Sequence, residues 1–300
     1  MRRKWKSVVG AFAAAVLAAS LLAGCGGGKR SEQETELRET EAQAGQLVGG
    51  TLRVRAAKDI GDLNPHTMKS QMYAQNWVYE SLVAMKDGEI VPELAESWEV
   101  SSDGCTYTFH LREGVRFSDG SQWDSQIARR NLEAVKNHGD AYSFLQSLEL
   151  LESIKTPDDL TLVLNLAQPC NSLLNDFTFS RPLVMLGEAG FPAEGDPYDN
   201  GIASPVGTGM WVLKEYEPEQ YALFERNENY WGEKPSFQYL RVEVIPDVNT
   251  AASAMKAGEI DLMMDSTQIT AELYREMEAA GFMVDTVPTT SVSSVSINTA

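Results

Sequence analysis

The side chains that most often carry covalent or metal chemistry are scarce in this chain. Among its 300 residues there are three histidines and three cysteines, which are His66, His110, His138, Cys25, Cys105 and Cys170. The sequence contains no Gly-x-Ser-x-Gly nucleophile elbow, no His-Glu-x-x-His zinc motif and no phosphate loop ending in Gly-Lys-Ser/Thr. The adjacent carboxyls Asp158 and Asp159 are typical of a turn. The sequence therefore predicts a protein that is not an enzyme.

Gly207-Thr208-Gly209 is the segment most similar to a phosphate-binding loop, because glycines let a backbone approach an anion closely. A dinucleotide fingerprint also needs a third glycine and a following helix. Here Trp211, Val212 and Leu213 predict a strand instead. We expect the two glycines to mark the start of that strand, at positions that need special backbone angles.

Cys25 ends a segment with the features of a secretion signal. The basic residues at its start are Arg2, Arg3, Lys4 and Lys6. Residues 8–22 form an apolar run that is short for a membrane span. Leu22-Ala23-Gly24-Cys25 resembles a bacterial lipobox, where the chain is cut before the cysteine and the sulfur receives diacylglycerol. The alternative is a free cysteine after an ordinary signal.

We therefore predict that residues 1–24 are a lipoprotein signal peptide and that Cys25 anchors the protein to a membrane outside the cytoplasm. In a cell with an outer membrane this location would be periplasmic. Residues 25–48 predict a lipidated flexible tether, because they are rich in Glu, Gln and Ala and have almost no large apolar side chain. A short helix from Glu32 to Ala44 is the alternative, but it would have no apolar face for packing. The folded body is predicted to cover 49–300.

The body is strongly acidic. The formal net charge of −18 becomes −22 when the four basic residues of the signal are removed. No cluster of Lys and Arg follows the signal, which argues against nucleic acid as a partner. The spacing of Cys105 and Cys170 fits no metal motif, and we expect two unpaired buried thiols, although an exported protein could pair them.

Short strands and helices are predicted to alternate irregularly along the body. The predicted strands are 51–55, 160–166, 221–226, 241–245, 260–263 and a strand with Tyr107, Phe109 and Leu111 on one face. The predicted helices are 71–83, 249–257 and one capped by Asp124 that buries Ile127, Asn131, Ala134 and Val135. Asp87-Gly88 and Asp103-Gly104 predict hairpin turns. This mixture indicates an α/β body with mixed sheets.

Several ordered segments of the body are recognisable together. They are Leu63-Asn64-Pro65-His66, Pro92-Glu93-Leu94-Ala95-Glu96-Ser97-Trp98, Gly207-Thr208-Gly209, Gly258-Glu259-Ile260-Asp261-Leu262, and 71–75, 78–83, 107–112 and 115–120. In sequence and spacing they resemble the peptide- and nickel-binding family of extracellular solute-binding proteins. Two further segments, 226–235 and 244–247, look more like the nickel-binding branch than like the average peptide receptor.

The resemblance implies a periplasmic-binding-protein-like α/β fold of type II, in which two lobes close on a ligand like a clamshell. It implies that 49–300 is the first lobe, with an inserted subdomain at about 89–204. Family chains are far longer, and the end at Asn298-Thr299-Ala300 looks like the strand that crosses into the second lobe. We expect this chain to stop near the hinge, without the second lobe.

Three ligand-binding residues follow from the resemblance. Arg181 falls where the nickel branch has its ligand arginine, and its guanidinium suits the carboxylates of a chelate. The alternative for Arg181 is a surface ion pair with Asp176. Met72 matches a pocket methionine, although a methionine at helical spacing is more often part of a core. Phe144 stands at a pocket tryptophan position and lacks the indole N–H, while Ala141 stands where the branch has another arginine.

The resemblance assigns no metal ligand within the chain. A histidine that ligates the metal in some members would lie beyond Ala300, and none of the three histidines replaces it by position. His66 follows Pro65 in a turn, and His138 stands at a polar helix end. Either could bind a metal, but we expect a solvated or capping histidine at both.

The sequence thus predicts a substrate-binding lipoprotein of an ABC importer that captures nickel as a small-molecule chelate. Its expected partners are the permease and ATPase subunits, the small-molecule ligand and the membrane; no resident cofactor is expected, and the full-length protein should be a monomer. The alternative is an oligopeptide or dipeptide receptor of a related importer, which would bind extended peptide backbone. A sensor or adaptor lipoprotein without a transport role is an alternative from another class.

The anchor can be tested directly. Changing Cys25 to Ser should release the protein from membranes, because a hydroxyl cannot accept the thioether-linked lipid. Detergent-free fractionation of cells into membrane and soluble parts measures this. Unchanged retention of the variant in the membrane fraction would contradict the lipobox interpretation.

Overall fold

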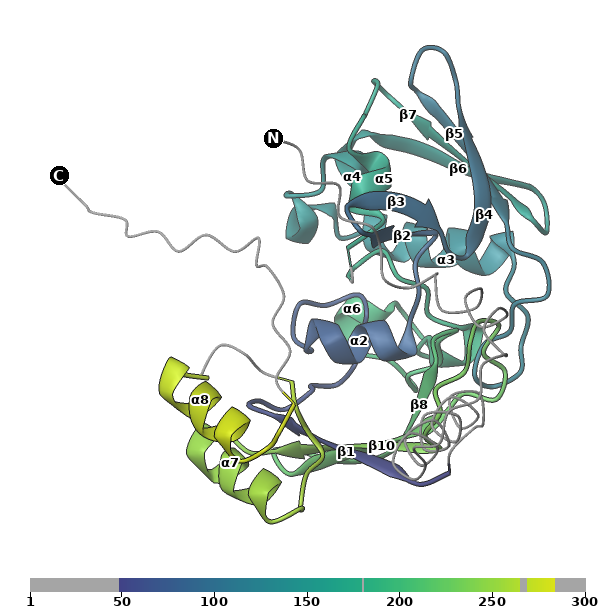
Figure 1. The fold of residues 1–300 in the computed structure, drawn as a ribbon. Coiled ribbons are helices and arrows are strands. Elements are labelled where there is room, and N and C mark those ends of the chain that lie inside the picture. Colours follow the sequence, from purple (N-terminus) through teal and green to yellow (C-terminus); the bar gives the residue numbers. More distant parts are fainter. Residues whose placement is uncertain (1–48, 180, 265–268, 284–300) are drawn as a thin grey trace, which may run out of the picture. The chain divides into compact units, whose positions relative to one another are not determined.

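The computed structural model of the protein describes residues 49–179, 181–264 and 269–283 (Figure 1). The predicted signal peptide, the anchor at Cys25, the tether and the chain end near Ala300 lie outside the described residues. None of the helices in the described part is both long and apolar enough to cross a membrane.

A mixed five-stranded sheet has the order β11-β1-β10-β9-β8. Its strands are β1 (Thr51–Ala56), β8 (Trp211–Glu217), β9 (Tyr221–Arg226), β10 (Tyr239–Val244) and β11 (Leu262–Met263). β1 runs parallel to β10 and β11, whereas β8, β9 and β10 are antiparallel neighbours. Alternate side chains of β9 and β10 are buried, as a sheet with one covered face requires. This sheet confirms the predicted α/β class with mixed strand directions.

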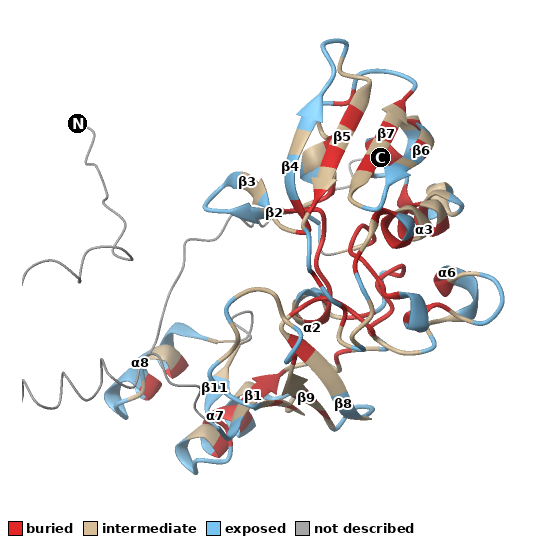
Figure 2. Cartoon of the chain, turned by 90° about the vertical axis from the view of Figure 1, so that its right-hand side faces the viewer, coloured by how far each residue is buried: buried red, intermediate tan, exposed pale blue. Residues whose placement is uncertain are grey.

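A second sheet is entirely antiparallel, in the order β4-β5-β7-β6. Its strands are β4 (Ala95–Val100), β5 (Thr106–Leu111), β6 (Leu151–Asp158) and β7 (Thr161–Leu166). The alternation predicted for β5 and β7 is confirmed, because Tyr107, Phe109, Leu111, Leu162, Leu164 and Leu166 are all buried. Figure 2 shows this buried stripe along both strands.

Two predicted hairpin turns are confirmed. In the turn between β2 (Val83–Lys86) and β3 (Glu89–Pro92), Asp87 and Gly88 both have positive φ, at 53° and 82°. This is the requirement of the type I′ turn that suits the twist of a two-residue hairpin. Gly104, between β4 and β5, has φ 71°.

In the described part of the chain the longest helix is α3 (Ser125–Lys136). It begins as predicted at Asp124, whose side chain accepts hydrogen bonds from the backbone N–H groups of Gln126 and Ile127. The other regular helices are α2 (Met72–Val78), α7 (Val248–Lys256) and α8 (Ala271–Ala279), and the short ones are η1 (Gly139–Tyr142), α4 (Gln146–Leu150), α5 (Leu173–Asp176), η2 (Glu188–Gly190) and α6 (Pro197–Asn200). α7 ends where Gly258 takes φ 74°, and its alanines pack on Ile260 and Leu273.

The helix predicted over 71–83 is shorter than expected. α2 ends at Val78, and Tyr79 already has extended backbone angles. The chain beyond it hydrogen-bonds to distant segments, since Glu80 O accepts from Met185 N and Ser81 O accepts from Leu94 N. Ser81 and Leu82 are buried as predicted, but by these tertiary contacts and not by a helix face.

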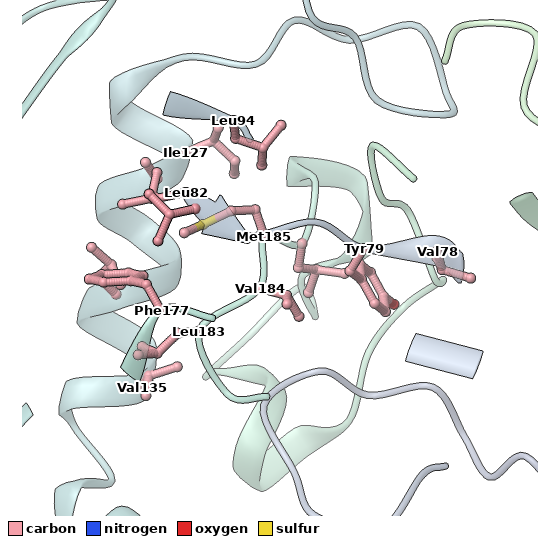
Figure 3. Packing of buried hydrophobic residues seen from close by; sticks show 14 of the residues in the cluster. Val78, Tyr79, Leu82, Leu94, Ile127, Val135, Phe177, Leu183, Val184 and Met185 are labelled. Carbon is pink, nitrogen blue, oxygen red and sulfur yellow. The ribbon is translucent and has the colours of Figure 1, made fainter. Parts of the chain in front are cut away.

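One continuous hydrophobic cluster contains side chains of both sheets, including Phe109 of β5 and Phe224 of β9. α2 joins it through Trp77, whose ring meets Phe224 edge-on at 5.6 Å between centroids. Figure 3 shows Tyr79, Leu82 and Met185 within this cluster. The two sheets therefore share one core.

Gly207 and Gly209 are needed because the backbone of α2 lies too close for a side chain. Neither glycine has a positive φ, so the prediction of special backbone angles was wrong. A Cβ on Gly207 would lie 1.9 Å from Val78 O, and one on Gly209 would lie 2.5 Å from Trp77 O. Their missing side chains let the start of β8 pack directly on the last turn of α2, where Gly209 N donates to Val78 O at 2.9 Å.

This close contact predicts a large stability effect. Changing Gly207 to Ala should lower the free energy of unfolding by about 3 kcal/mol, the upper end of the range for overpacking, because backbone atoms must move apart. The control is Gly139 to Ala, since nothing lies within 4 Å of a Cβ there and its φ is not positive. Urea unfolding of both variants measures the difference, and equal stability would contradict the contact.

Candidate ligand-binding site

Arg181 lies beside the start of α2. Its Nη1 atom donates a hydrogen bond to the backbone carbonyl of Ser70, two residues before Met72. The guanidinium is partly buried, and this desolvation lowers the pKa of Arg181, although an arginine remains charged at any physiological pH. Among the described residues Arg181 has no ion pair; Asp176, its suggested partner, accepts a hydrogen bond from Ser147 N.

Large apolar side chains are exposed around this arginine. Met72 is 46% exposed, Phe144 56% and Phe179 50%. The rings of Phe144 and Phe179 lie 6.4 Å apart between centroids, and Phe179 is two residues before Arg181. Met72 is therefore not a core methionine. We call Met72, Phe144, Phe179 and Arg181 the ligand face.

Two contacts connect the members of the ligand face. Arg181 donates to the carbonyl of Ser70, two residues before Met72, and the ring of Phe144 lies beside that of Phe179, two residues before Arg181. The sequence-based prediction named Met72, Phe144 and Arg181 as ligand-binding residues and did not include Phe179, whose ring lies beside that of Phe144. The closeness of Phe179 to Arg181 in the sequence was the available signal.

A cavity of about 220 Å³ is lined by Phe179 and by Asn76, which lies one helical turn after Met72. It therefore borders the ligand face. Its other lining residues are Tyr79, Glu80, Ser81, Val83, Ala84, Met85, Glu93, Thr178 and Val184. Two carboxyl groups, those of Glu80 and Glu93, thus belong to a cavity next to exposed apolar side chains.

Glu80 and Glu93 are held by neutral donors and lie near one arginine. Glu80 accepts a hydrogen bond of 2.8 Å from the indole of Trp231, and Glu93 accepts one of 2.8 Å from Ser81 N. Arg112 donates to the backbone carbonyl of Glu93, and its guanidinium lies 4.3 Å from the centroid of the Trp231 ring. Burial raises the pKa of Glu80 to about 6. Burial and the neighbouring Glu80 raise the pKa of Glu93 to about 7.

The histidines differ from their expected environments. His66 was expected to be solvated or capping, but it is buried and its Nε2 lies 3.0 Å from Asn131 Oδ1. Burial lowers the pKa of His66 to about 4, so it is neutral at pH 7. His138 is partly buried at the N-cap position of η1, makes no side-chain cap hydrogen bond, and has its Nε2 2.7 Å from Asp196 Oδ2. His110 lies on the surface, with its Nε2 3.7 Å from Glu99 Oε1. Cys105 and Cys170 are both free thiols, but only Cys170 is buried; Cys105 is partly exposed, so the prediction of a buried thiol was wrong for Cys105.

The raised pKa values of the two glutamates predict how stability depends on pH. The folded protein holds more protons than the unfolded chain at pH values between the ordinary 4.5 of a glutamate and about 7. The protonated carboxyls therefore contribute their full share to the unfolding free energy below pH 4.5. This contribution is lost as the pH rises through 6 to 7.

Changing Glu93 to Gln should reduce the fall in unfolding free energy between pH 5 and pH 8 by on the order of 1–2 kcal/mol, since one pKa unit corresponds to about 1.4 kcal/mol. Urea titrations across this range measure it. The matched control is Glu96 to Gln, an exposed glutamate of β4, which should leave the profile unchanged. A variant at Glu93 with the wild-type profile would mean that this carboxyl is ionised in the folded protein.

Comparisons with known proteins agree with the fold. Residues 89–300 match the model for bacterial extracellular solute-binding proteins, family 5 Middle. The chain is 39% identical over 207 residues to the nickel-binding periplasmic protein of Escherichia coli, covering 68% of this chain and 39% of the relative. It is 30% identical over 213 residues to the dipeptide-binding protein of Escherichia coli, and this match covers 62% of this chain and 38% of the relative.

Among solved structures, NikA from Brucella suis in complex with Fe(III)-EDTA is similar, with a TM-score of 0.74 and 36% identity. That match covers 77% of this chain and 47% of NikA, so the chain spans less than half the length of these relatives. The names of the relatives describe binding proteins and no enzyme, in agreement with the sequence-based prediction. The family's description as extracellular agrees with a location outside the cytoplasm. The chain thus belongs to the family 5 bacterial extracellular solute-binding proteins, in the branch that contains nickel- and peptide-binding members.

Proposed function

We propose that this chain forms one wall of the ligand cleft in the substrate-binding lipoprotein of an ABC importer, and that the ligand is nickel held as a chelate by small organic carboxylates. The observation that carries the proposal is the position of Arg181. Its guanidinium donates to Ser70 O, exposed apolar residues stand two positions from Ser70 and from Arg181 in the chain, and Arg181 has no carboxylate partner among the described residues. A carboxylate from outside the protein would complete its hydrogen bonding.

The chemistry of the ligand face suits a carboxylate chelate. A guanidinium offers paired N–H donors to a carboxylate, and the hydrogen bonds are strongest where water is excluded. Met72, Phe144 and Phe179 would exclude water without competing for the carboxylate or the metal. Two relatives support this ligand class, since one is named for nickel binding and NikA was solved with a metal bound to EDTA, a polycarboxylate chelator.

The proposal makes Arg181 the main cationic contact of this wall. Ala141 stands where the nickel branch has a second arginine, and Phe144 cannot donate a hydrogen bond as a tryptophan would. The rest of the ligand's contacts would come from a second lobe. The protein would then deliver its ligand to the permease and ATPase subunits while Cys25 holds it at the membrane. It would need no resident cofactor and would act as a monomer.

A peptide is the second candidate ligand. The cavity with Glu80 and Glu93 next to the ligand face could accept a cationic amino group, while Arg181 accepts a carboxylate. The similarity to a dipeptide-binding protein supports this alternative. The two ligands make different demands on Glu93, because a nickel chelate with carboxylates has no need of an anionic cavity.

Changing Arg181 to Ala in the full-length protein should weaken binding of nickel–histidine by roughly 1.5–3 kcal/mol, the range for hydrogen bonds to charged groups. Changing it to Lys should restore only part of this, because an ammonium cannot reproduce the planar fork. Isothermal titration calorimetry measures the affinities, with a mixture of short peptides as the competing ligand class.

The control variant is Arg129 to Ala, which removes a surface arginine paired with Glu133 on α3; chelate affinity should not change. Unchanged chelate affinity in Arg181→Ala, together with a lower melting temperature, would show that Arg181 is structural. Tight peptide binding that is lost in Glu93→Gln, with no chelate binding, would favour the peptide receptor.

A further inference from the structure

His138, Asp196 and Asp199 bring three metal-ligand atoms together where the chain beyond α3 meets the start of α6. His138 Nε2 lies 2.7 Å from Asp196 Oδ2 and 3.8 Å from Asp199 Oδ2, and one ligand atom from each residue lies within 4.8 Å of the others. We propose that this His-Asp-Asp cluster binds a divalent transition-metal ion, at a site separate from the ligand face.

The local structure holds two of the three ligands in place. Asp196 caps α6, and its Oδ1 accepts hydrogen bonds from the N–H groups of Tyr198 and Asp199 at 3.0 and 3.2 Å. Its Oδ2 is left to face His138. The imidazole of His138 stacks on the ring of Tyr198, with centroids 4.3 Å apart and planes at 21°. A bound ion would therefore find the imidazole and one carboxylate already oriented.

The separations suit a metal with short bonds. Zinc-type ions bind imidazole nitrogen and carboxylate oxygen at about 2.0–2.2 Å, so neighbouring ligand atoms lie about 3 Å apart around the ion. The observed 2.7 and 3.8 Å lie on either side of that value. Asp199 is mostly exposed, so its carboxylate can move the remaining distance.

An ion can reach the cluster from solvent. His138 and Tyr198 line an open cavity of about 440 Å³ together with Asp140, a further carboxylate that can attract a cation. Lys136 also lines this cavity, but its ammonium group is bonded to Glu152 O at 3.0 Å. Water molecules in the cavity could complete the coordination, as they do in sites with three protein ligands.

The ligand types indicate which metals bind. An imidazole combined with carboxylates suits Ni²⁺, Zn²⁺ or Cu²⁺, whereas Mg²⁺ and Ca²⁺ prefer oxygen ligands alone. The competing explanation is an ion pair that joins the end of α3 to α6 and never binds a metal. A titration with metal alone separates the two.

The experiment uses the full-length protein, purified free of metal, titrated with Ni²⁺ or Zn²⁺ without any organic chelator. Calorimetry should show one ion bound per chain, and Mg²⁺ should not compete. Asp199→Asn keeps the α6 cap and the His138–Asp196 pair, and it should weaken binding of the ion by at least about tenfold, as losses around metal sites commonly do. His138→Ala should abolish it. His110→Ala, which removes the surface histidine near Glu99, is the matched control and should bind normally.

Three results would overturn the proposal: no binding by the wild type, equal binding by the wild type and Asp199→Asn, or loss of binding in His110→Ala. Should His138→Ala fail to fold, Asp199→Asn and the visible spectrum of bound Co²⁺ still decide the matter. The site is independent of the proposed nickel-chelate function. Arg181→Ala should leave binding of the bare ion intact, and Asp199→Asn should leave chelate binding intact, so the two proposals can fail separately.

Discussion

The direct packing of the backbone at Gly207 and Gly209 on the last turn of α2 is the constraint on which the rest of the described structure depends. Gly209 N bonds to Val78 O, Gly207 O accepts from Ser118 N, and Val206 O accepts from Gly187 N. These three bonds join α2, the loop after β5, the segment before η2 and the start of β8. Because a Cβ at Gly207 would overlap Val78 O, only glycine allows this close contact. It brings the mixed sheet and the antiparallel sheet onto one core.

The ligand face is built on that junction. α2 leaves it with Met72 at its exposed start, and the carbonyl of Ser70 just before α2 holds Arg181, which follows the segment of Phe179. The polar groups that the junction buries must find partners within the protein, because an unpaired buried carboxylate is costly. Glu80 accepts a hydrogen bond from the indole of Trp231, and Glu93 accepts one from Ser81 N. Burial also raises the pKa of both carboxyls, which favours their neutral form. The cavity that contains these two carboxyl groups is lined by Phe179, two residues before Arg181.

The His-Asp-Asp cluster shares no residue with the ligand face. It depends on α3 and α6, whose positions follow from other buried contacts: Asn64 donates to Pro197 O at the start of α6, and Asn131 of α3 donates to Leu186 O. His66 lies near both, buried and neutral, with its Nε2 at Asn131. Polar networks of this kind orient side chains that the sequence separates widely.

The features that depend on neighbouring residues follow from the amino-acid sequence. The alternation of apolar side chains defined β5 and β7, Asp124 defined the start of α3, and Asp87-Gly88 and Gly258 defined a hairpin and a helix end, because turn and cap preferences act within a few residues. The motifs also identified the family, and the resemblance predicts Arg181, Met72 and Phe144 as ligand-binding residues. Long-range contacts of the folded chain fix the end of α2, require glycine at 207 and 209, bury His66, and bring His138 to Asp196 and Asp199. In each of these cases the deciding partner lies far away in the chain, and contacts of that range leave no periodic pattern in a single sequence.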